Sequence, residues 1–428
     1  MSNKLGKIKA LIEGLKYRNE SKVSGTQIVY DMIIDELNQY EEELHEITNL
    51  KETTGHTHFR VKEVSDKILK LIDEDESVLR IQDKKSGKNI GMKATDLELF
   101  DISKRALEDK IASTQQDEDG LNLGMYLALN KNEELTLKAL ENNVASLQQD
   151  KMGENIGIVA VRSGMENVVL KAMENREACF QENAWGTNIP RMAAIHGMET
   201  ATLKALDDVE ICLHQTNKSS HNICYCVAFS DMRSGVDKIL ENEELCYLQD
   251  DNGDNIGFYC LKRGLDNSVL KALDNEKLST MQNNQGKNLG MLCVDMAFPD
   301  GVMKALDNEV ASIQQDSDGF NIGMYCGDAG WEEEVVKALD NKIASVQQNC
   351  AGWNIGMYAI DDCMIDASLK AIKNKVARQQ KSNQNKDFYS IAVEKGFKPI
   401  IEELEKIKET EEINNEESIS SDESNFNM

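Results

Sequence analysis

The stretch Asp316-Ser-Asp-Gly319-Phe-Asn321-Ile-Gly-Met324-Tyr-Cys326, followed after Gly330 by Val335-Val-Lys337-Ala-Leu339, recurs along most of the chain. Its asparagine returns every 33 residues, with one step of 34, at Asn89, Asn122, Asn155, Asn188, Asn222, Asn255, Asn288, Asn321 and Asn354. A repeat of this length predicts supersecondary units stacked in file, because one unit alone cannot bury its apolar face.

Each copy predicts a turn, a short helix, a tight loop and a longer helix. Gly319 lies two residues before the asparagine, where a positive φ can reverse the chain. Asn321 then serves as the N-cap of the short helix, and Gly330, nine residues later, ends it. The longer helix carries Lys337-Ala-Leu339, with apolar residues at amphipathic spacing and Lys337 on the solvent side.

This unit resembles the ankyrin repeat, whose hairpin motif Ala-Asp-Val-Asn-x-x-Asp-x-x-Gly-x-Thr-Pro-Leu-His can be laid over residues 311–326 with one deletion. Asn replaces the family's capping Thr, Ile its Pro, Met its His, and a glycine such as Gly323 its buried Leu. A glycine inside a helix costs about 1 kcal/mol relative to Ala, so its recurrence predicts close backbone packing. The resemblance covers about residues 80–405 and implies an all-α solenoid of about nine to ten ankyrin-like repeats. The tetratricopeptide repeat, which lacks a Gly-centred turn, is the alternative solenoid.

Three segments follow from the position of the repeat. Residues 1–78 lack it and predict an N-terminal helical region, with helices over 4–17, 27–50 and 61–72, that caps the open end of the array. A separate partner-binding or dimerising bundle is the alternative for this region. The array spans 79–408, with a degenerate copy at 216–222 and a modified last copy at 387–396. The acidic, Ser- and Asn-rich segment 409–428 predicts a disordered tail, which serves as a signal, a phosphorylation site or a solubilising segment.

Composition excludes several classes of function. A net charge of -27 argues against nucleic-acid and anionic-membrane partners, because the field of the protein repels phosphate. Neither an apolar run of eighteen residues nor an apolar signal core occurs, so we expect a soluble, cytoplasmic protein. Of the ten cysteines, Cys260, Cys293 and Cys326 recur at the repeat step and predict small, reduced core residues.

No arrangement of residues typical of catalysis is found. The recurring glycines open no phosphate loop after a strand, and neither the cysteines nor the histidines have zinc-ligand spacing. We therefore expect no catalytic residue, no cofactor and no metal. An enzyme with its site in the N-terminal region or at the degenerate repeat near 212–226, where His214 and Cys224 lie, is the alternative.

The resemblance implies partners that lie against the hairpin tips and the inner helices of the concave side. The residue after the turn glycine differs between copies, as expected of a recognition surface, and is Lys88, Leu121, Glu154, Thr187, His221, Asp254, Lys287, Phe320 or Trp353. Large aromatic side chains are favoured binding hot spots, which adds Trp185 at a hairpin tip and Trp331 in an inter-helix loop. The alternative is that Phe320 and Trp353 only fill space between neighbouring loops.

These observations predict a protein–protein interaction scaffold that is not an enzyme and whose partner the sequence does not name. An alternative is a secreted bacterial effector that uses the same array on host proteins in the host cytoplasm. That alternative rests on the end of the chain, which resembles the acidic C-terminal signals of type IV secretion substrates.

Overall fold

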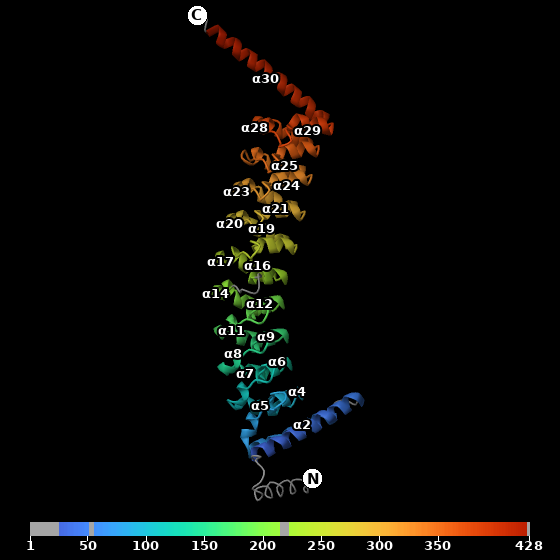
Figure 1. Ribbon diagram of the computed structural model, residues 1–428, viewed down its shortest axis with the longest axis vertical. Coiled ribbons are helices and arrows are strands. Elements are labelled where there is room, and N and C mark those ends of the chain that lie inside the picture. The colour runs from blue at the N-terminus through green and yellow to red at the C-terminus, as the bar shows by residue number, and fades with distance from the viewer. Residues whose placement is uncertain (1–24, 51–54, 215–221, 426–428) are drawn as a thin grey trace. The chain divides into compact units, whose positions relative to one another are not determined.

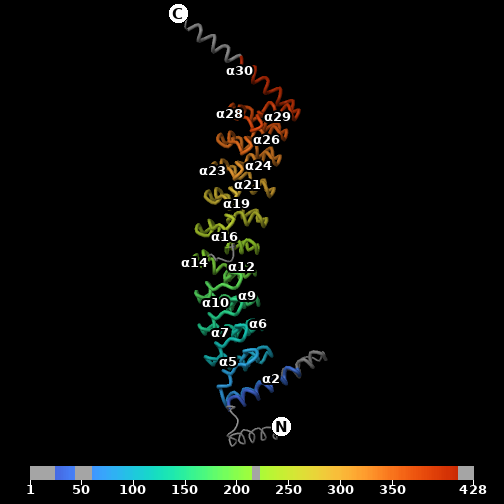
Figure 2. The backbone as a smooth tube through the Cα atoms, in the orientation of Figure 1, coloured from blue at the N-terminus to red at the C-terminus, as the bar shows by residue number. Residues whose placement is uncertain are grey.

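The computed structural model describes residues 25–50, 55–214 and 222–425, and over these ranges the chain is an all-α array of helical repeats without a strand (Figure 1). It divides into two compact units, Met1–Ser219 and Ser220–Met428, which we describe separately as unit 1 and unit 2. Within each unit the backbone repeats one path from copy to copy (Figure 2). The all-α repeat architecture predicted from the sequence is confirmed.

The helices of unit 1 are α2 (Gly25–Leu50), α3 (Gly55–Glu74), η1 (Glu76–Arg80), α4 (Ile90–Asp96), α5 (Phe100–Glu108), η2 (Ala112–Thr114), α6 (Leu123–Leu129), α7 (Glu133–Ala139), α8 (Asn143–Leu147), α9 (Ile156–Arg162), α10 (Glu166–Ala172), α11 (Arg176–Phe180), α12 (Ile189–Ile195), α13 (Glu199–Ala205) and α14 (Val209–Leu213).

The helices of unit 2 are α15 (Ile223–Phe229), α16 (Arg233–Leu240), α17 (Glu243–Cys246), α18 (Ile256–Lys262), α19 (Asp266–Asp274), α20 (Glu276–Thr280), α21 (Leu289–Asp295), α22 (Pro299–Ala305), α23 (Glu309–Ile313), α24 (Ile322–Asp328), α25 (Glu332–Ala338), η3 (Ala344–Val346), α26 (Ile355–Asp361), α27 (Ile365–Ala371), α28 (Lys375–Gln379), α29 (Phe388–Lys395) and α30 (Lys398–Asn425).

Each repeat contains three short helices, whereas the sequence predicted a short helix followed by a longer one. In the copy that begins at Asn321, α24 and α25 are both seven residues long, so the expected difference in length is wrong. Just before the third helix, η3, the side chain of Asn341 accepts hydrogen bonds from the Ile343 and Ala344 amides at 3.0 and 3.1 Å. Ala344 and Ser345, which follow the second helix, belong to this third helix.

The repeating asparagine is an N-cap, as predicted, and its side chain also joins the first helix to the third. The Oδ1 atom of Asn321 accepts from the Met324 amide at 2.9 Å. Its Nδ2 atom donates to the Ala344 carbonyl at 3.1 Å and to Oε1 of Gln347 at 2.8 Å. The Nε2 atom of Gln347 donates in turn to the Ile313 carbonyl of the preceding repeat at 2.7 Å. Because Asn321 is fully buried, this chain of hydrogen bonds lies inside the stack.

The glutamine lies 26 residues after the asparagine, and three copies lack it. Asn188, Asn222 and Asn255 are followed at that offset by His214, Leu248 and Met281. In these copies the Nδ2 atom of the asparagine is buried and has no hydrogen-bond partner. A buried unsatisfied donor costs about 1–3 kcal/mol, so the stacks are weakest at these copies.

Met281→Gln should stabilise the chain by about 1 kcal/mol, because the new Oε1 atom can accept from the Asn255 amide. The matched control is Met281→Leu, which changes the packing but adds no acceptor, and it should not raise stability. Urea unfolding followed by circular dichroism measures both. A Met281→Gln variant no more stable than the leucine control would contradict the role assigned to the glutamine.

The glycine inside the first helix allows close packing, as predicted. A Cβ atom on Gly323 would lie 2.5 Å from Cδ1 of Ile355 and 2.7 Å from Cβ of Ala338. Ile355 opens the first helix of the next repeat, and Ala338 belongs to the Lys-Ala-Leu helix. The interior glycine therefore brings successive first helices into contact.

The lysine of Lys-Ala-Leu faces solvent only in part, because it contacts the preceding repeat. Lys337 lies 2.6 Å from Asp307, and it donates to the Met303 carbonyl at 2.6 Å. The pairs Lys304–Asp274 and Lys370–Asp340 repeat this contact. Because these ion pairs are partly exposed, they add little stability, and their main effect is to hold neighbouring repeats in register.

The residue nine positions after the asparagine has a positive φ whether or not it is glycine. Gly264 and Gly330 have φ values of 67° and 77°. Non-glycine residues take the same conformation in other copies, and these are Glu98 (57°), Lys131 (57°), Asp231 (54°), Ala297 (55°) and Cys363 (56°). For a residue with a Cβ atom this left-handed conformation costs about 1–2 kcal/mol.

Ala297→Gly should therefore raise the free energy of unfolding by about 0.5–1 kcal/mol, since the relieved strain exceeds the added entropy of the unfolded chain. Gly264→Ala, at the same position of another repeat, should lower it by a similar amount. Thermal unfolding of the two variants beside the unchanged chain tests the pair. Equal midpoints for all three would show that the loop relaxes without strain.

In unit 1, α2 and α3 pack on the first repeat. Ile33 of α2 and Ile68 of α3 share a buried cluster with Ile90 of α4 and Ile102 of α5. The expected helix over 27–50 is confirmed, whereas α3 begins at Gly55, earlier than the expected residue 61. The expected helix over 4–17 lies outside the described residues.

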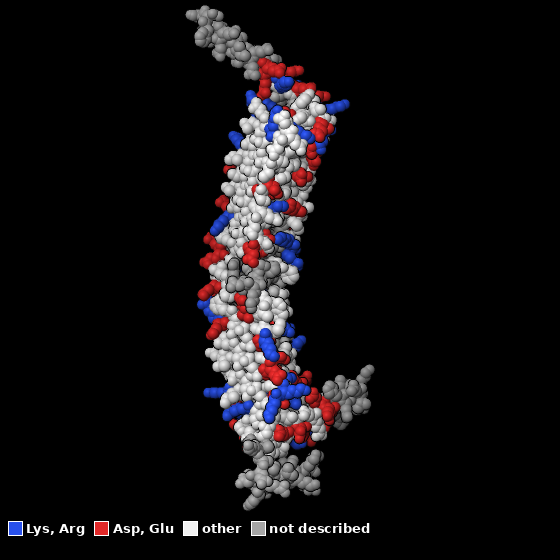
Figure 3. Space-filling model, viewed as in Figure 1, with Lys and Arg blue, Asp and Glu red and all other residues white. Residues whose placement is uncertain are grey.

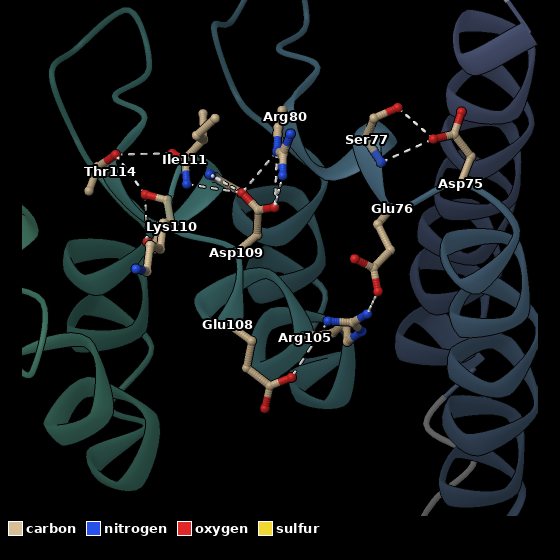
Figure 4. A network of polar contacts seen from close by, with 12 residues as sticks. Asp75, Glu76, Ser77, Arg80, Arg105, Glu108, Asp109, Lys110, Ile111 and Thr114 are labelled. Atoms are coloured by element: carbon tan, nitrogen blue, oxygen red, sulfur yellow. Dashed lines mark hydrogen bonds and ion pairs between the residues drawn. The ribbon is translucent and has the colours of Figure 1, made fainter.

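Polar contacts join η1 to the first repeat (Figure 4). Asp75 caps η1 by accepting from the Ser77 amide at 3.1 Å. Arg80 lies 2.9 Å from Asp109, and Asp109 in turn accepts from the Ala112 amide that opens η2. This region thus packs on the first repeat, and its role as a cap of the array stays a prediction.

At the other end of unit 2, α30 continues to Asn425, whereas the sequence predicted disorder from residue 409. No Gly or Pro follows Pro399, and the segment is rich in Glu, Lys and Ile, so nothing local stops the helix. Near its middle, Glu411 lies 2.8 Å from Arg378 and 3.5 Å from Lys375 of α28.

Candidate protein-binding surface

The loop tips of successive repeats are joined by backbone hydrogen bonds. In unit 2 the Cys350 amide donates to the Asp318 carbonyl at 2.9 Å, and in unit 1 the Ala184 amide donates to the Met152 carbonyl at 2.7 Å. At Gly319, which has a φ of 81°, a Cβ atom would lie 2.9 Å from the Cα atom of Asn349 in the next tip. The turn glycine thus supplies both the reversed backbone and the room for the neighbouring loop, which makes the tips a fixed row.

In four copies the residue after the turn glycine is charged and pairs with the end of its own first helix, eight residues later. Lys287 lies 2.6 Å from Asp295, and Lys88 lies 2.7 Å from Asp96. Two copies reverse the signs, with the pairs Glu154–Arg162 and Asp254–Lys262. This position therefore carries an ion pair within the repeat.

Burial at this position departs from the sequence prediction in two copies. Glu154 is only 2% exposed and Asp254 only 4% exposed. Their carboxylates are thus unavailable to a partner, and the expectation that they project from a recognition surface is wrong. The reason is the ion pair with the end of the first helix, which draws the short acidic side chain inward while the longer Arg162 or Lys262 remains in solvent.

Three predicted residues meet in one row of rings in unit 2. The Phe320 ring centroid lies 5.3 Å from that of Tyr325 and 5.7 Å from that of Tyr358. The Trp353 ring lies 5.0 Å from Tyr358, and the ammonium of Lys287 lies 4.8 Å from the centre of the Tyr325 ring. We call Lys287, Tyr325, Phe320, Tyr358 and Trp353 the aromatic row. Its rings are all half-buried, so each packs on a neighbour and still presents part of its surface.

Sequence reasoning missed the two tyrosines of this row. Both lie four residues after the capping asparagine, where Tyr126 and Tyr259 also occur, and this recurrence was the available signal. The Tyr325 hydroxyl donates to Asp316 at 2.6 Å, and the Tyr358 hydroxyl accepts from Asn349 at 2.8 Å. Burial raises the pKa of Tyr358 to about 12 and also raises the pKa of Tyr325, so both hydroxyls are neutral at physiological pH.

Trp185 is the most exposed of the predicted aromatics. Its side chain is 59% exposed at a tip of unit 1, and Met152, at the same position of the preceding tip, is 43% exposed. Thr187, two residues later, is half-buried, and its amide donates to Asn183 at 3.0 Å. Trp185 and Met152 form a second apolar patch on the row of tips.

The remaining predicted residues lie apart from both patches or outside the described part. Trp331 is half-buried in the loop between α24 and α25, as expected, and has no ring contact with the aromatic row among the described residues. His221 lies outside the described residues, as do residues 215–220 of the degenerate repeat considered as an enzyme site. Within that repeat Cys224 is buried, and its thiol donates to the Leu245 carbonyl at 3.5 Å.

The cysteines separate by burial. Cys350 and Cys363 are exposed, and the other eight are buried and unbridged. Burial raises the pKa of the Cys260 and Cys293 thiols to about 12. The three cysteines at the repeat step are therefore core residues, as predicted.

Thiol labelling with Ellman's reagent at pH 8 should show two fast-reacting groups, because only the exposed thiols reach the reagent. The buried thiols should react only as the chain unfolds in urea. A Cys350→Ser/Cys363→Ser variant should lose the fast phase entirely. More than two fast groups in the unchanged chain would show that the core opens readily.

No group of three or more His, Cys, Asp or Glu side chains is placed to hold a metal ion in the described part of the chain. Within that same part, every helix is too short or too polar to cross a membrane.

Comparisons with known proteins identify no family. No protein-family model matches the sequence, and no curated protein matches it. One similar solved structure is an ankyrin repeat protein from Leishmania major, 12% identical over 51% of this chain and 80% of that chain, with a TM-score of 0.38. The chain is an all-α helical repeat array.

Proposed function

We propose that this chain is a protein-binding scaffold of the ankyrin-like type, which captures a partner protein on the row of loop tips and has no catalytic step of its own. The observation that carries the proposal is the aromatic row, in which Phe320 and Trp353 are ordered against Tyr325 and Tyr358. Large half-buried rings lose little entropy on binding and offer apolar area beside a polar edge. Residues predicted on the sequence alone thus form part of one ordered surface.

The charges beside the row indicate the kind of partner surface. The Lys287 ammonium lies between Asp295 and the Tyr325 ring, and the hydroxyls of both tyrosines are held by the tip residues Asp316 and Asn349. With these polar groups already satisfied, the row presents ring faces rather than free charge. A protein segment with apolar or aromatic side chains fits such a surface better than a phosphate-bearing ligand does.

Trp185 with Met152 supplies a second contact in unit 1. Nothing in the fold requires a large side chain at these tip positions, because Asp119, Asn252 and Gln285 occupy them in other copies. Their exposure therefore favours a binding role.

Phe320→Ala and Trp353→Ala should each weaken binding of a partner isolated with the full chain by at least tenfold, because hot-spot truncation costs about 2 kcal/mol or more. Val393→Ala on α29, where the side chain is 51% exposed, is the matched control and should bind normally. Trp185→Ala tests the unit 1 patch. Isothermal titration calorimetry gives the affinities, and thermal unfolding confirms that each variant is folded.

A photoreactive benzoyl-phenylalanine at position 353 should crosslink the same partner, and one at position 393 should not. Unchanged affinity in both aromatic variants, together with no crosslinking at position 353, would overturn the proposed surface. Binding lost only in the Trp185 variant would move the site to unit 1.

A further inference from the structure

Unit 2 has a second surface row on its third helices, away from the loop tips. An asparagine precedes each third helix, and the residue two positions after it is Glu244, Lys277, Val310, Ile343 or Val376. We call these five side chains the edge row. The three aliphatic members follow one another and are 55%, 56% and 60% exposed. Three consecutive repeats thus present a bare aliphatic side chain at one position.

Side-chain hydrogen bonds between successive third helices hold the edge-row residues in register. The asparagines Asn308, Asn341 and Asn374 donate to the serine of the preceding third helix, at 2.8, 2.7 and 3.1 Å. Each of these asparagines also accepts a hydrogen bond from the amide of the edge-row residue that follows it, as in the Val310 amide donating to Asn308 at 3.0 Å. The aliphatic side chains are therefore placed before any partner arrives, which lowers the entropic cost of association.

The fold does not require aliphatic residues at this position. Glu244 and Lys277 occupy it in the same unit, each after an asparagine that caps the third helix. Valine and isoleucine are also poorer helix formers than glutamate or lysine. Since neither packing nor helix formation explains Val310, Ile343 and Val376, their exposure indicates a contact with another molecule.

The residues immediately before the edge row change sign along the unit. They are Glu243, Glu276 and Glu309 in the first three copies and Lys342 and Lys375 in the next two. Figure 3 shows acidic side chains at the edge of the unit near α17 and basic side chains beside α28. The apolar members of the row thus lie where the acidic end meets the basic end.

A row of this kind is complementary to itself when reversed. If two copies pack antiparallel about an axis between α23 and η3, Val310 of each faces Ile343 of the other. Glu309 then faces Lys342, and Glu276 faces Lys375, twice each by symmetry. A parallel arrangement would instead set like charges against each other.

We propose that the edge row is a self-association surface, on which a second copy of this chain packs antiparallel to form a two-fold symmetric dimer. Val310 and Ile343 of both copies form its apolar centre, Val376 faces the aliphatic stem of Lys277, and the Glu and Lys residues form its charged rim. The surface lies on the third helices, so the dimer goes beyond the proposed function and leaves the loop tips of both copies available. Because the apolar centre is small, we expect a dimer that dissociates on dilution and at high salt.

Sedimentation velocity of the full chain over a range of concentrations tests the proposal. Ile343→Asp should weaken the dimer at least tenfold, because it sets a carboxylate against Val310 of the second copy. Val144→Asp is the matched control, since Val144 is 61% exposed at the equivalent position of α8 in unit 1. It should leave the dimer unchanged.

Charge reversal tests the antiparallel register. Glu309→Lys and Lys342→Glu should each weaken the dimer, because each sets like charges opposite, and the double variant should restore it. A chain that stays monomeric at the highest concentration, or a dimer that Ile343→Asp does not weaken, would overturn the proposal. So would a double variant no better than the single ones. None of these measurements uses the partner protein, so the outcome is independent of the proposed function.

Discussion

The stack depends on one buried side-chain amide in each repeat. In the copy at Asn321, the side-chain oxygen of the capping asparagine accepts a hydrogen bond from the first helix. Its nitrogen donates to the third helix and to the glutamine that follows. The glutamine then reaches the preceding repeat. Where these contacts are made, removal of the amide would leave a buried carbonyl unpaired and an uncapped helix at once. The modified last copy has Asp387 as the cap in place of asparagine. The copies that lack the glutamine show the cost, since the amides of Asn188, Asn222 and Asn255 are left without a partner.

This fixed frame leaves certain surface positions free to vary. The residue after the turn glycine is charged in some copies and aromatic in others. Where it is charged, the residue eight positions later carries the opposite charge and forms an ion pair with it. The edge-row residue is likewise Glu, Lys, Val or Ile, although the backbone follows the same path in each copy. Frame and surface are thus separated by burial: buried polar groups specify the stack, and exposed side chains specify what it contacts.

The two proposed surfaces use this separation differently. At the tips, the aromatic row is ordered by ring contacts between neighbouring repeats, so its recognition surface exists only when the repeats are stacked. On the third helices, order comes from the hydrogen bonds between asparagine and serine, and the apolar side chains themselves touch little. A stacked array can therefore hold two surfaces on different edges, one for a partner protein and one for a second copy.

The sequence by itself determined the repeat, the all-α class, the N-capping role of Asn321, the close packing at Gly323 and the core position of the cysteines. Each of these features depends on local chemistry that recurs at a fixed step. One sequence therefore shows the same local pattern several times. Only the tertiary structure decided that Glu154 and Asp254 are buried, that a third helix follows the second, and that Tyr358 lies between Phe320 and Trp353. These features depend on contacts between repeats and between ends of one repeat, and spacing along the chain does not specify which side chains meet across such a distance.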